Sequence, residues 1–150
     1  MKTFESIKLH DKESFTKTIS ETDLYLFCRI SGDFNPLHVD EMYASRKLFK
    51  GRLVHGMLVA SLISNVLGMK LPGPGTVYIS QNLKFLAPVY VGDTITTSVE
   101  VIEKIPEKNH IVLRTFCVNQ EEKVVLDGEA KVLFNPDIDE AEQNDRENII

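Results

Sequence analysis

Asp33 and His38 stand five residues apart in the segment "SGDFNPLHVD", residues 31–40. An aspartate and a neutral histidine are a natural pair for moving protons near pH 7, because histidine titrates there and a carboxylate can orient or activate water. On a helix the two side chains would point in different directions, whereas in a turn they can converge. Pro36 cannot lie inside a helix, so we expect a loop or kinked turn. Asn35 suits such a turn because its amide can bond nearby backbone.

The same residues also have a purely structural interpretation. Aspartate and asparagine are common in turns, so Asp33 and Asn35 can shape the turn, and His38 can cap a helix that begins near Asp40. The spacing of the histidines argues against a metal site, because none forms an HxxxH or comparable ligand pattern; the four lie at positions 10, 38, 55 and 110. The sequence also lacks a phosphate-binding glycine loop and a Gly-x-Ser-x-Gly motif.

A second candidate is "VHGM", residues 54–57, at the start of an apolar segment. The first turn of a helix has unpaired amide hydrogens and a partial positive charge. Gly56 has no side chain to block a ligand from approaching its amide. Such an amide could stabilise an enolate or oxyanion by a preorganised hydrogen bond. Alternatively, Gly56 allows close packing of the helix on a sheet.

Three helices are predicted around these residues. Residues 20–30 begin with Ser20 and Asp23, an acidic variant of the capping box. Residues 40–49 read as a short amphipathic helix. Residues 54–67 contain no Asp, Glu, Lys or Arg, and a helix that is apolar on nearly every side is normally buried. We therefore expect residues 54–67 to be a central core helix, too short to span a membrane.

The rest of the chain predicts a sheet around that helix. Four β-branched, largely alternating segments are separated by turn signals; they cover residues 76–92, 93–105, 110–120 and 123–134. Their short connections predict an antiparallel meander, and a fifth strand is expected from residues 4–9 or 14–19. The predicted fold is a single α+β domain, residues 1–135, in which a curved antiparallel sheet wraps around the central helix.

Charge and cysteine content narrow the function classes. The net charge is −5, and the last 15 residues hold six of the 22 acidic residues and one of the 17 basic ones. Residues 136–150 thus predict an acidic, poorly ordered tail or a short exposed helix. The neutral remainder argues against nucleic acid as a partner.

The first residues lack the apolar core of a signal peptide, so we expect a cytoplasmic protein without a membrane anchor. Cys28 and Cys117 are predicted to be reduced, buried thiols.

Two stretches, "SGDFNPLHVDEMYA" and "GRLVHGMLVASLISNVLG", closely resemble the hydratase motif of the MaoC-like (R)-specific enoyl-CoA hydratases. The resemblance continues into "PGPGTVYISQNLKFLAPVYVGDTITTSVEV" and covers roughly residues 15–135. It includes an Asp-x-Asn-Pro-x-His element followed by a His-Gly-Met element. The resemblance implies the hotdog fold. It also implies a homodimer joined edge to edge, which agrees with the tendency of proteins to cover exposed strand edges.

The resemblance also implies roles for individual residues. Asp33 and His38 would be the catalytic dyad, and Gly56 would offer its backbone amide to the thioester carbonyl. Ser64 would help to position the dyad, and Asn35 would support the loop. The implied reaction is reversible addition of water to trans-2-enoyl-CoA, giving (R)-3-hydroxyacyl-CoA, without a metal or redox cofactor.

Alternatives to this activity remain open. The nearest is a dehydratase acting on acyl-carrier-protein thioesters, which differs mainly in the carrier. A hotdog thioesterase would need a carboxylate or water aimed at the carbonyl carbon, which the Asp-x-Asn-Pro-x-His element does not resemble. A non-catalytic acyl-binding subunit would not need both Asp33 and His38. Basic side chains that could bind the CoA phosphates are Arg46, Lys47, Lys50, Arg52 and Lys84.

Overall fold

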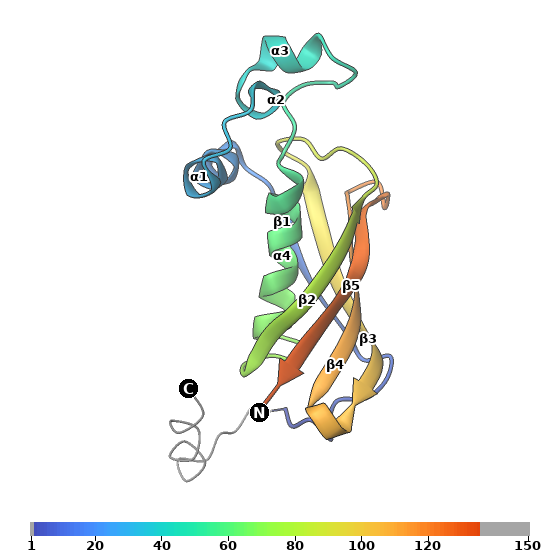
Figure 1. The fold of residues 1–150 in the computed structure, drawn as a ribbon. Helices are drawn as coiled ribbons and strands as arrows, with labels where there is room; N and C mark the ends of the chain where they lie inside the picture. Colours follow the sequence, from blue (N-terminus) through green and yellow to red (C-terminus); the bar gives the residue numbers. More distant parts are fainter. Residues whose placement is uncertain (1, 136–150) are drawn as a thin grey trace.

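The computed structural model describes residues 2–135 of the 150-residue chain. A five-stranded antiparallel sheet lies along one long helix; two of the three shorter helices stand beyond one end of the sheet, and the third lies beside the start of the long helix (Figure 1). The elements in chain order are β1 (Lys12–Thr18), α1 (Glu21–Ser31), α2 (Pro36–Val39), α3 (Glu41–Ser45), α4 (Gly56–Met69), β2 (Thr76–Phe85), β3 (Thr94–Ile105), the 3₁₀ helix η1 (Pro106–Lys108), β4 (His110–Val118) and β5 (Val124–Phe134). The predicted α+β class is confirmed. The acidic tail, residues 136–150, lies outside the described residues, so that prediction stands untested.

The strand order is β1-β3-β4-β5-β2. Strands β3, β4 and β5 are consecutive neighbours, as a meander requires, and the fifth strand is β1, which pairs with β3. The prediction that β2 also belongs to the meander is wrong, because β2 pairs with β5 at the far edge. Residues 86–93 connect β2 to β3 across the end of the sheet instead of forming a hairpin, and they include Pro88, which cannot donate to a strand ladder.

Helix α4 supplies the centre of the core. One face packs against the sheet, and its buried residues are Leu58, Val59, Ala60, Leu62, Ile63, Val66 and Leu67. This confirms the predicted central helix and explains the large apolar residues on that face. The opposite face is exposed in the single chain and carries Met57, Ser61 and Ser64. Within the described residues, no helix is both long and apolar enough to cross a membrane.

Helices α1, α2 and α3, with the loops around them, form a segment that we call the overhang, residues 20–53. The predicted capping box opens α1: Ser20 Oγ accepts from the Asp23 amide at 3.1 Å, and Asp23 Oδ2 accepts from the Ser20 amide at 2.9 Å. Gly32 ends α1 in the left-handed conformation, at φ 75°, which glycine adopts without strain. The chain leaves α1 in a fixed direction just before Asp33.

Two predictions for the overhang are wrong in detail. Pro36 does not exclude a helix, since it occupies the first position of the one-turn helix α2, where no amide hydrogen is needed. Helix α3 covers Glu41–Ser45 instead of residues 40–49. Asp40 caps α3 by accepting from the Tyr43 amide at 2.9 Å, so His38 does not cap this helix.

Candidate active site

The turn before α2 is held by its own side chains. Asp33 Oδ1 accepts from the Asn35 amide at 3.1 Å, and Asn35 Oδ1 accepts from the Leu37 amide at 3.0 Å, which caps α2. Asn35 therefore has the loop-supporting contacts that were predicted for it. The turn uses only one carboxylate oxygen of Asp33. The turn-forming interpretation and the dyad interpretation are thus compatible.

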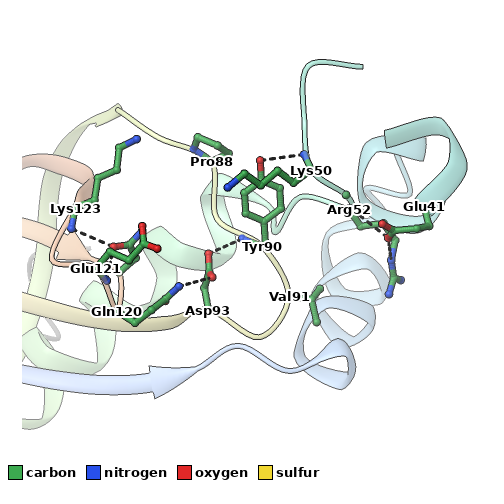
Figure 2. Close-up of a pocket in the computed structure, with 12 residues that line it drawn as sticks. Glu41, Lys50, Arg52, Pro88, Tyr90, Val91, Asp93, Gln120, Glu121 and Lys123 are labelled. Carbon is green, nitrogen blue, oxygen red and sulfur yellow. Dashed lines mark hydrogen bonds and ion pairs between the residues drawn. The ribbon is translucent and has the colours of Figure 1, made fainter. Parts of the chain in front are cut away.

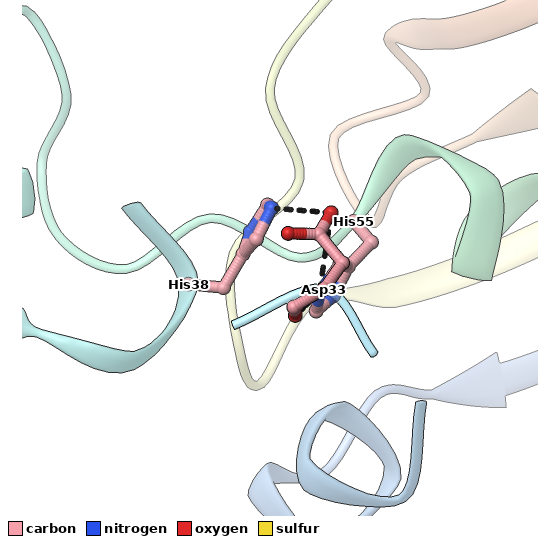
Figure 3. A group of neighbouring side chains, drawn as sticks. All are labelled: Asp33, His38 and His55. Carbon is pink, nitrogen blue, oxygen red and sulfur yellow. Dashed lines mark hydrogen bonds and ion pairs between the residues drawn. The ribbon is translucent and has the colours of Figure 1, made fainter. Parts of the chain in front are cut away.

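The other carboxylate oxygen faces His38. Asp33 Oδ2 lies 3.7 Å from His38 Nε2, while His38 Nδ1 lies 2.8 Å from the carbonyl oxygen of Leu53 (Figure 3). A carbonyl only accepts, so Nδ1 carries a hydrogen, and Nε2 is the ring nitrogen that faces Asp33. A separation of 3.7 Å is too long for a direct hydrogen bond. Both atoms can instead contact a third polar atom placed between them, as general acid–base chemistry requires.

The sequence reasoning missed His55, which completes the cluster. Its ring stacks on His38 with centroids 3.6 Å apart and an interplanar angle of 23°. Its Nε2 lies 3.0 Å from the Asp33 carbonyl oxygen, and the side chain is only 3% exposed. Phe27 covers the ring at a centroid distance of 5.0 Å. The only sequence signal was its place beside Gly56 in "VHGM", and spacing along the chain gave no reason to join it to Asp33.

The three side chains also resemble a metal-binding set. Asp33, His38 and His55 each offer a ligand atom, and these atoms lie within 4.8 Å of one another. However, His55 Nε2 must donate to the Asp33 carbonyl, which leaves its lone pair on Nδ1, and Nδ1 has no hydrogen-bond partner in the described structure. The arrangement suits proton transfer better than metal ligation.

Gly56 begins α4 beside an apolar cavity of about 610 Å³. The cavity lining also includes His38, Met57, Phe85, Leu86 and Val125. A Cβ added to Gly56 would lie 2.8 Å from the Phe85 ring, so a side chain here would compete with a cavity wall. Gly56 is itself exposed, so a ligand can approach its amide, while Phe85 belongs to β2, so close packing of helix on sheet also needs glycine here.

Ser64 is not part of this cluster in the single chain. It is exposed on α4, eight residues beyond Gly56, or about 12 Å along the helix axis. Among the described residues, no hydrogen bond joins it to Asp33 or His38. Its predicted positioning role therefore has no contact within one chain to support it.

The basic candidates divide by their surroundings. Arg52 forms ion pairs with Glu21 and Glu41 and donates to the Tyr25 hydroxyl at 2.9 Å, so it ties parts of the overhang together. The hydrogen bond that Arg52 donates to Glu21 raises the pKa of Arg52. Lys50 and Arg52 both line a polar cavity of about 530 Å³, whose lining also holds the carboxylates of Glu41, Asp93 and Glu121 (Figure 2). The other three are exposed, and they are Arg46, Lys47 and Lys84.

Comparison with known proteins agrees with this geometry. The (R)-specific enoyl-CoA hydratase of Rhodospirillum rubrum is 52% identical over 130 residues, which cover 87% of this chain and 90% of that protein. The 3-hydroxybutyryl-CoA dehydratase of Methylorubrum extorquens is 49% identical over 86% of this chain and 82% of its own length. The unliganded R-hydratase PhaJ1 from Pseudomonas aeruginosa superposes with a TM-score of 0.84, at 42% identity, over 89% of this chain and 86% of that one.

The architecture is that of the hotdog fold, with the sheet wrapped along α4 as expected. Residues 5–122 match the MaoC like domain. The match includes the turn with Asp33 and His38, the start of α4 and most of the sheet. The chain therefore belongs to the MaoC-like domain family.

Proposed function

We propose that this protein is a hydro-lyase, an (R)-specific enoyl-CoA hydratase that adds water reversibly to trans-2-enoyl-CoA. The observation that carries the proposal is the 3.7 Å approach of Asp33 Oδ2 and His38 Nε2 at an apolar cavity whose lining includes His38 and Gly56. The polar pair suits water, and the apolar walls suit an acyl chain. The names of the relatives in Rhodospirillum rubrum and Methylorubrum extorquens support the same reaction class.

In the proposed reaction, water sits between Asp33 and His38. The water oxygen bonds to C3 of the enoyl thioester as one water proton passes to the dyad. The electrons of the C2–C3 double bond shift toward the thioester carbonyl, which gives an enolate. The dyad then returns a proton to C2, which gives the 3-hydroxyacyl thioester. One proton leaves water and one reaches C2, so the dyad ends each turnover as it began.

The developing enolate oxygen needs a hydrogen-bond donor. The Gly56 amide is a candidate because it lies in the first turn of α4, where amide hydrogens have no partner within the helix. The partial positive charge of the helix N-terminus adds to this donor. Fixed donors aimed at developing charge are often the largest contribution to catalysis.

The proposed reaction requires no metal or redox cofactor. The thioester carbonyl acidifies C2 and polarises the double bond, so protons and one fixed donor are sufficient. Dialysis against a chelator is expected to leave turnover unchanged. A loss of turnover that added metal restores would contradict this part of the proposal.

The polar cavity that contains Lys50 is the proposed site for the phosphates of CoA. It adjoins the apolar cavity, since Pro88 lines both, and Lys123 adds a second amine. Lys50→Ala is expected to raise KM for crotonyl-CoA but not for crotonyl-pantetheine, which lacks the phosphates. Lys84→Ala, on β2 outside this lining, is the control. An equal effect on both substrates would argue against this site.

The proposed assembly is a homodimer joined at β2. The two sheet edges differ: β1 carries the charged residues Lys12 and Lys17, whereas β2 exposes Val77 (57%) and Ile79 (46%). Charged edges resist pairing, and apolar ones invite it. Sedimentation is expected to give a dimer that Ile79→Lys converts to a monomer, while Glu13→Lys on β1 leaves it intact. A stable wild-type monomer at micromolar concentration would contradict the proposal.

A cytoplasmic location is proposed from the cysteines. Cys28 and Cys117 are both free and buried. Burial raises the pKa of the Cys117 thiol to about 11, which makes it unreactive as a thiolate. Free thiols are the rule in reducing compartments.

A spectrophotometric assay with crotonyl-CoA tests the proposal. Loss of the enoyl absorbance with an (R)-3-hydroxybutyryl product is expected. Release of free thiol instead would indicate a thioesterase. Turnover only with crotonyl-acyl-carrier protein would indicate the carrier-protein dehydratase, and no turnover with either substrate would indicate a binding subunit.

A further inference from the structure

We propose that His55 is a positioning residue that holds Asp33 and His38 in the geometry needed for proton transfer. The inference rests on the proposed function of the dyad. It concerns a side chain that lies behind the reacting groups and contacts both of them (Figure 3). The two contacts are of different kinds and can be removed separately.

The first contact is with Asp33. His55 Nε2 donates to the Asp33 carbonyl at 3.0 Å, and the same nitrogen lies 3.9 Å from Asp33 Oδ2. The Asp33 side chain is 50% exposed, so little packing restrains it. The hydrogen bond ties the backbone of an exposed turn to the buried start of α4.

The second contact is with His38. The His55 ring lies 3.6 Å from the His38 ring, almost parallel to it, and so restricts how far His38 can tilt. The His38 Nδ1 hydrogen bond to the Leu53 carbonyl oxygen sets the direction in which the ring points but leaves some freedom for its plane to tilt. Stacking removes that remaining freedom, so Nε2 stays aimed at Asp33.

The buried environment of His55 argues against a purely structural role. Its Nδ1 is buried without a hydrogen-bond partner, which is unfavourable for folding. An aromatic hydrocarbon ring would fill the same space beside Phe27 and remove this unpaired nitrogen. A phenylalanine at position 55 would lose the donor to Asp33 as well as this unpaired nitrogen, so the two effects on stability oppose each other and the variant should fold with near-wild-type stability. A purely structural role then predicts unchanged turnover.

The position of His55 also separates its role from substrate binding. His38 and Gly56 belong to the lining of the apolar cavity, whereas His55 does not. A change at His55 is thus expected to lower kcat and leave KM nearly unchanged. Loss of a cavity wall would alter both.

Three variants test the proposal. His55→Phe keeps the stacked ring but loses the donor, His55→Gln keeps a donor but loses the ring, and His55→Ala loses both. We expect kcat for crotonyl-CoA to fall about 10-fold in the first two and at least about 100-fold in His55→Ala, as expected when a catalytic group is misaligned. KM should stay within about twofold, and His55→Phe should melt close to the wild-type temperature. A His55→Phe protein with wild-type kcat, or a kcat loss matched by the unfolded fraction, would overturn the proposal.

A second measurement does not depend on turnover. The His38 Nδ1 proton, which is donated to Leu53, should give a slowly exchanging imidazole signal in the NMR spectrum of the wild type and of His55→Phe. In His55→Ala this signal should be lost to exchange with solvent. If it persists in His55→Ala, His55 does not position His38. This readout would stand even if the wild type failed to hydrate crotonyl-CoA, which would defeat the proposed function alone.

Discussion

The overhang and the body of the sheet with α4 are held together by different forces. Helix α4 buries seven apolar residues, whereas α1 buries Leu24 and Cys28, α3 buries Ala44 and α2 buries none. The overhang depends on caps, turns and the Arg52 ion pairs. Apolar burial dominates folding free energy, and exposed polar contacts contribute little. The dyad therefore lies on the segment that contributes least to the free energy of folding.

Activity and stability should therefore be separable by mutation. Changes to the dyad should remove turnover from a folded protein. Changes to the body should remove stability and leave the turnover of each folded molecule intact. Gly56 lies where the two regions meet, so substitutions there should show whether the start of α4 is needed for activity or for stability.

The largest expected effect is that of His38→Gln in the overhang. Removing a positioned acid or base costs about 10²–10⁴-fold in rate, so crotonyl-CoA hydration should fall by that factor. The melting temperature should barely change, because His38 is not part of the apolar core. His10→Gln on the surface of the body is the matched control and should keep wild-type turnover. Near-normal turnover of His38→Gln would show that His38 serves only the turn.

Gly56→Val should also remove hydration, by at least about 100-fold, because it fills the approach to the amide. The protein should stay folded, since the atoms in its way belong to Phe85, which is 53% exposed and can rotate. A smaller side chain and a matched control test the same point. Gly56→Ala should slow turnover. Gly68→Ala on the same helix should not, because a Cβ there meets nothing within 4 Å. Turnover and thermal unfolding are measured together. A folded and fully active Gly56→Val protein would refute the amide's role.

Leu113→Ala in β4 tests the body. Leu113 is fully buried and outside the lining of the apolar cavity, so the variant should lose about 2–5 kcal/mol of unfolding free energy while kcat per folded molecule is unchanged. Urea unfolding gives the free energy of unfolding, and the rate divided by the concentration of active sites gives kcat per folded molecule. Ile30→Ala in the overhang, where Ile30 is 82% exposed, should cost less than about 0.5 kcal/mol. Equal costs at the two sites would remove the contrast between the regions.

The smallest expected effect is electrostatic and lies in the sheet. Arg114 donates to Asp127 at 2.9 and 3.2 Å, and this hydrogen bonding lowers the pKa of Asp127 below its usual 3.8. A carboxyl whose pKa is lower in the folded state stabilises the fold above its unfolded pKa, and that contribution is lost as pH falls through the folded value. Because the pair is partly exposed, Asp127→Asn should cost about 0.2–1 kcal/mol near pH 7. The difference from wild type, measured by urea titration, should shrink as the pH falls below 3.8; a difference that grows there would contradict the sign.

Much of the body could be predicted from the sequence, because alternation and apolar content directly reflect burial. The uncharged run predicted α4, and the alternating segments predicted the strands. The partner of β2 could not be predicted, since alternation identifies a strand but says nothing about its neighbour. The pairing of β2 with β5 depends on residues 86–93 crossing the sheet end, which the turn signal at Gly92 does not reveal.

The candidate site was predicted only where its chemistry lies within one short segment. Asp33 and His38 are close in sequence, so a turn was enough to bring them together. His55 lies 22 residues from Asp33, and its stacking on His38 arises from how the overhang docks on the start of α4. Ser64, assigned by resemblance, lies on the exposed face of α4 and meets neither dyad residue within one chain. Contacts made by docking of separate segments leave no local pattern.

The central claim is that Asp33 acts on the water that adds to the substrate. The most direct test compares two aspartates of the overhang. Asp33→Asn and Asp40→Asn make the same chemical change, and an asparagine at position 40 can still cap α3. Rates of crotonyl-CoA hydration are measured at matched concentrations of folded protein. We expect Asp33→Asn to lose about 10²–10⁴-fold and Asp40→Asn to stay within about twofold of wild type. Equal rates in the two variants would contradict the account.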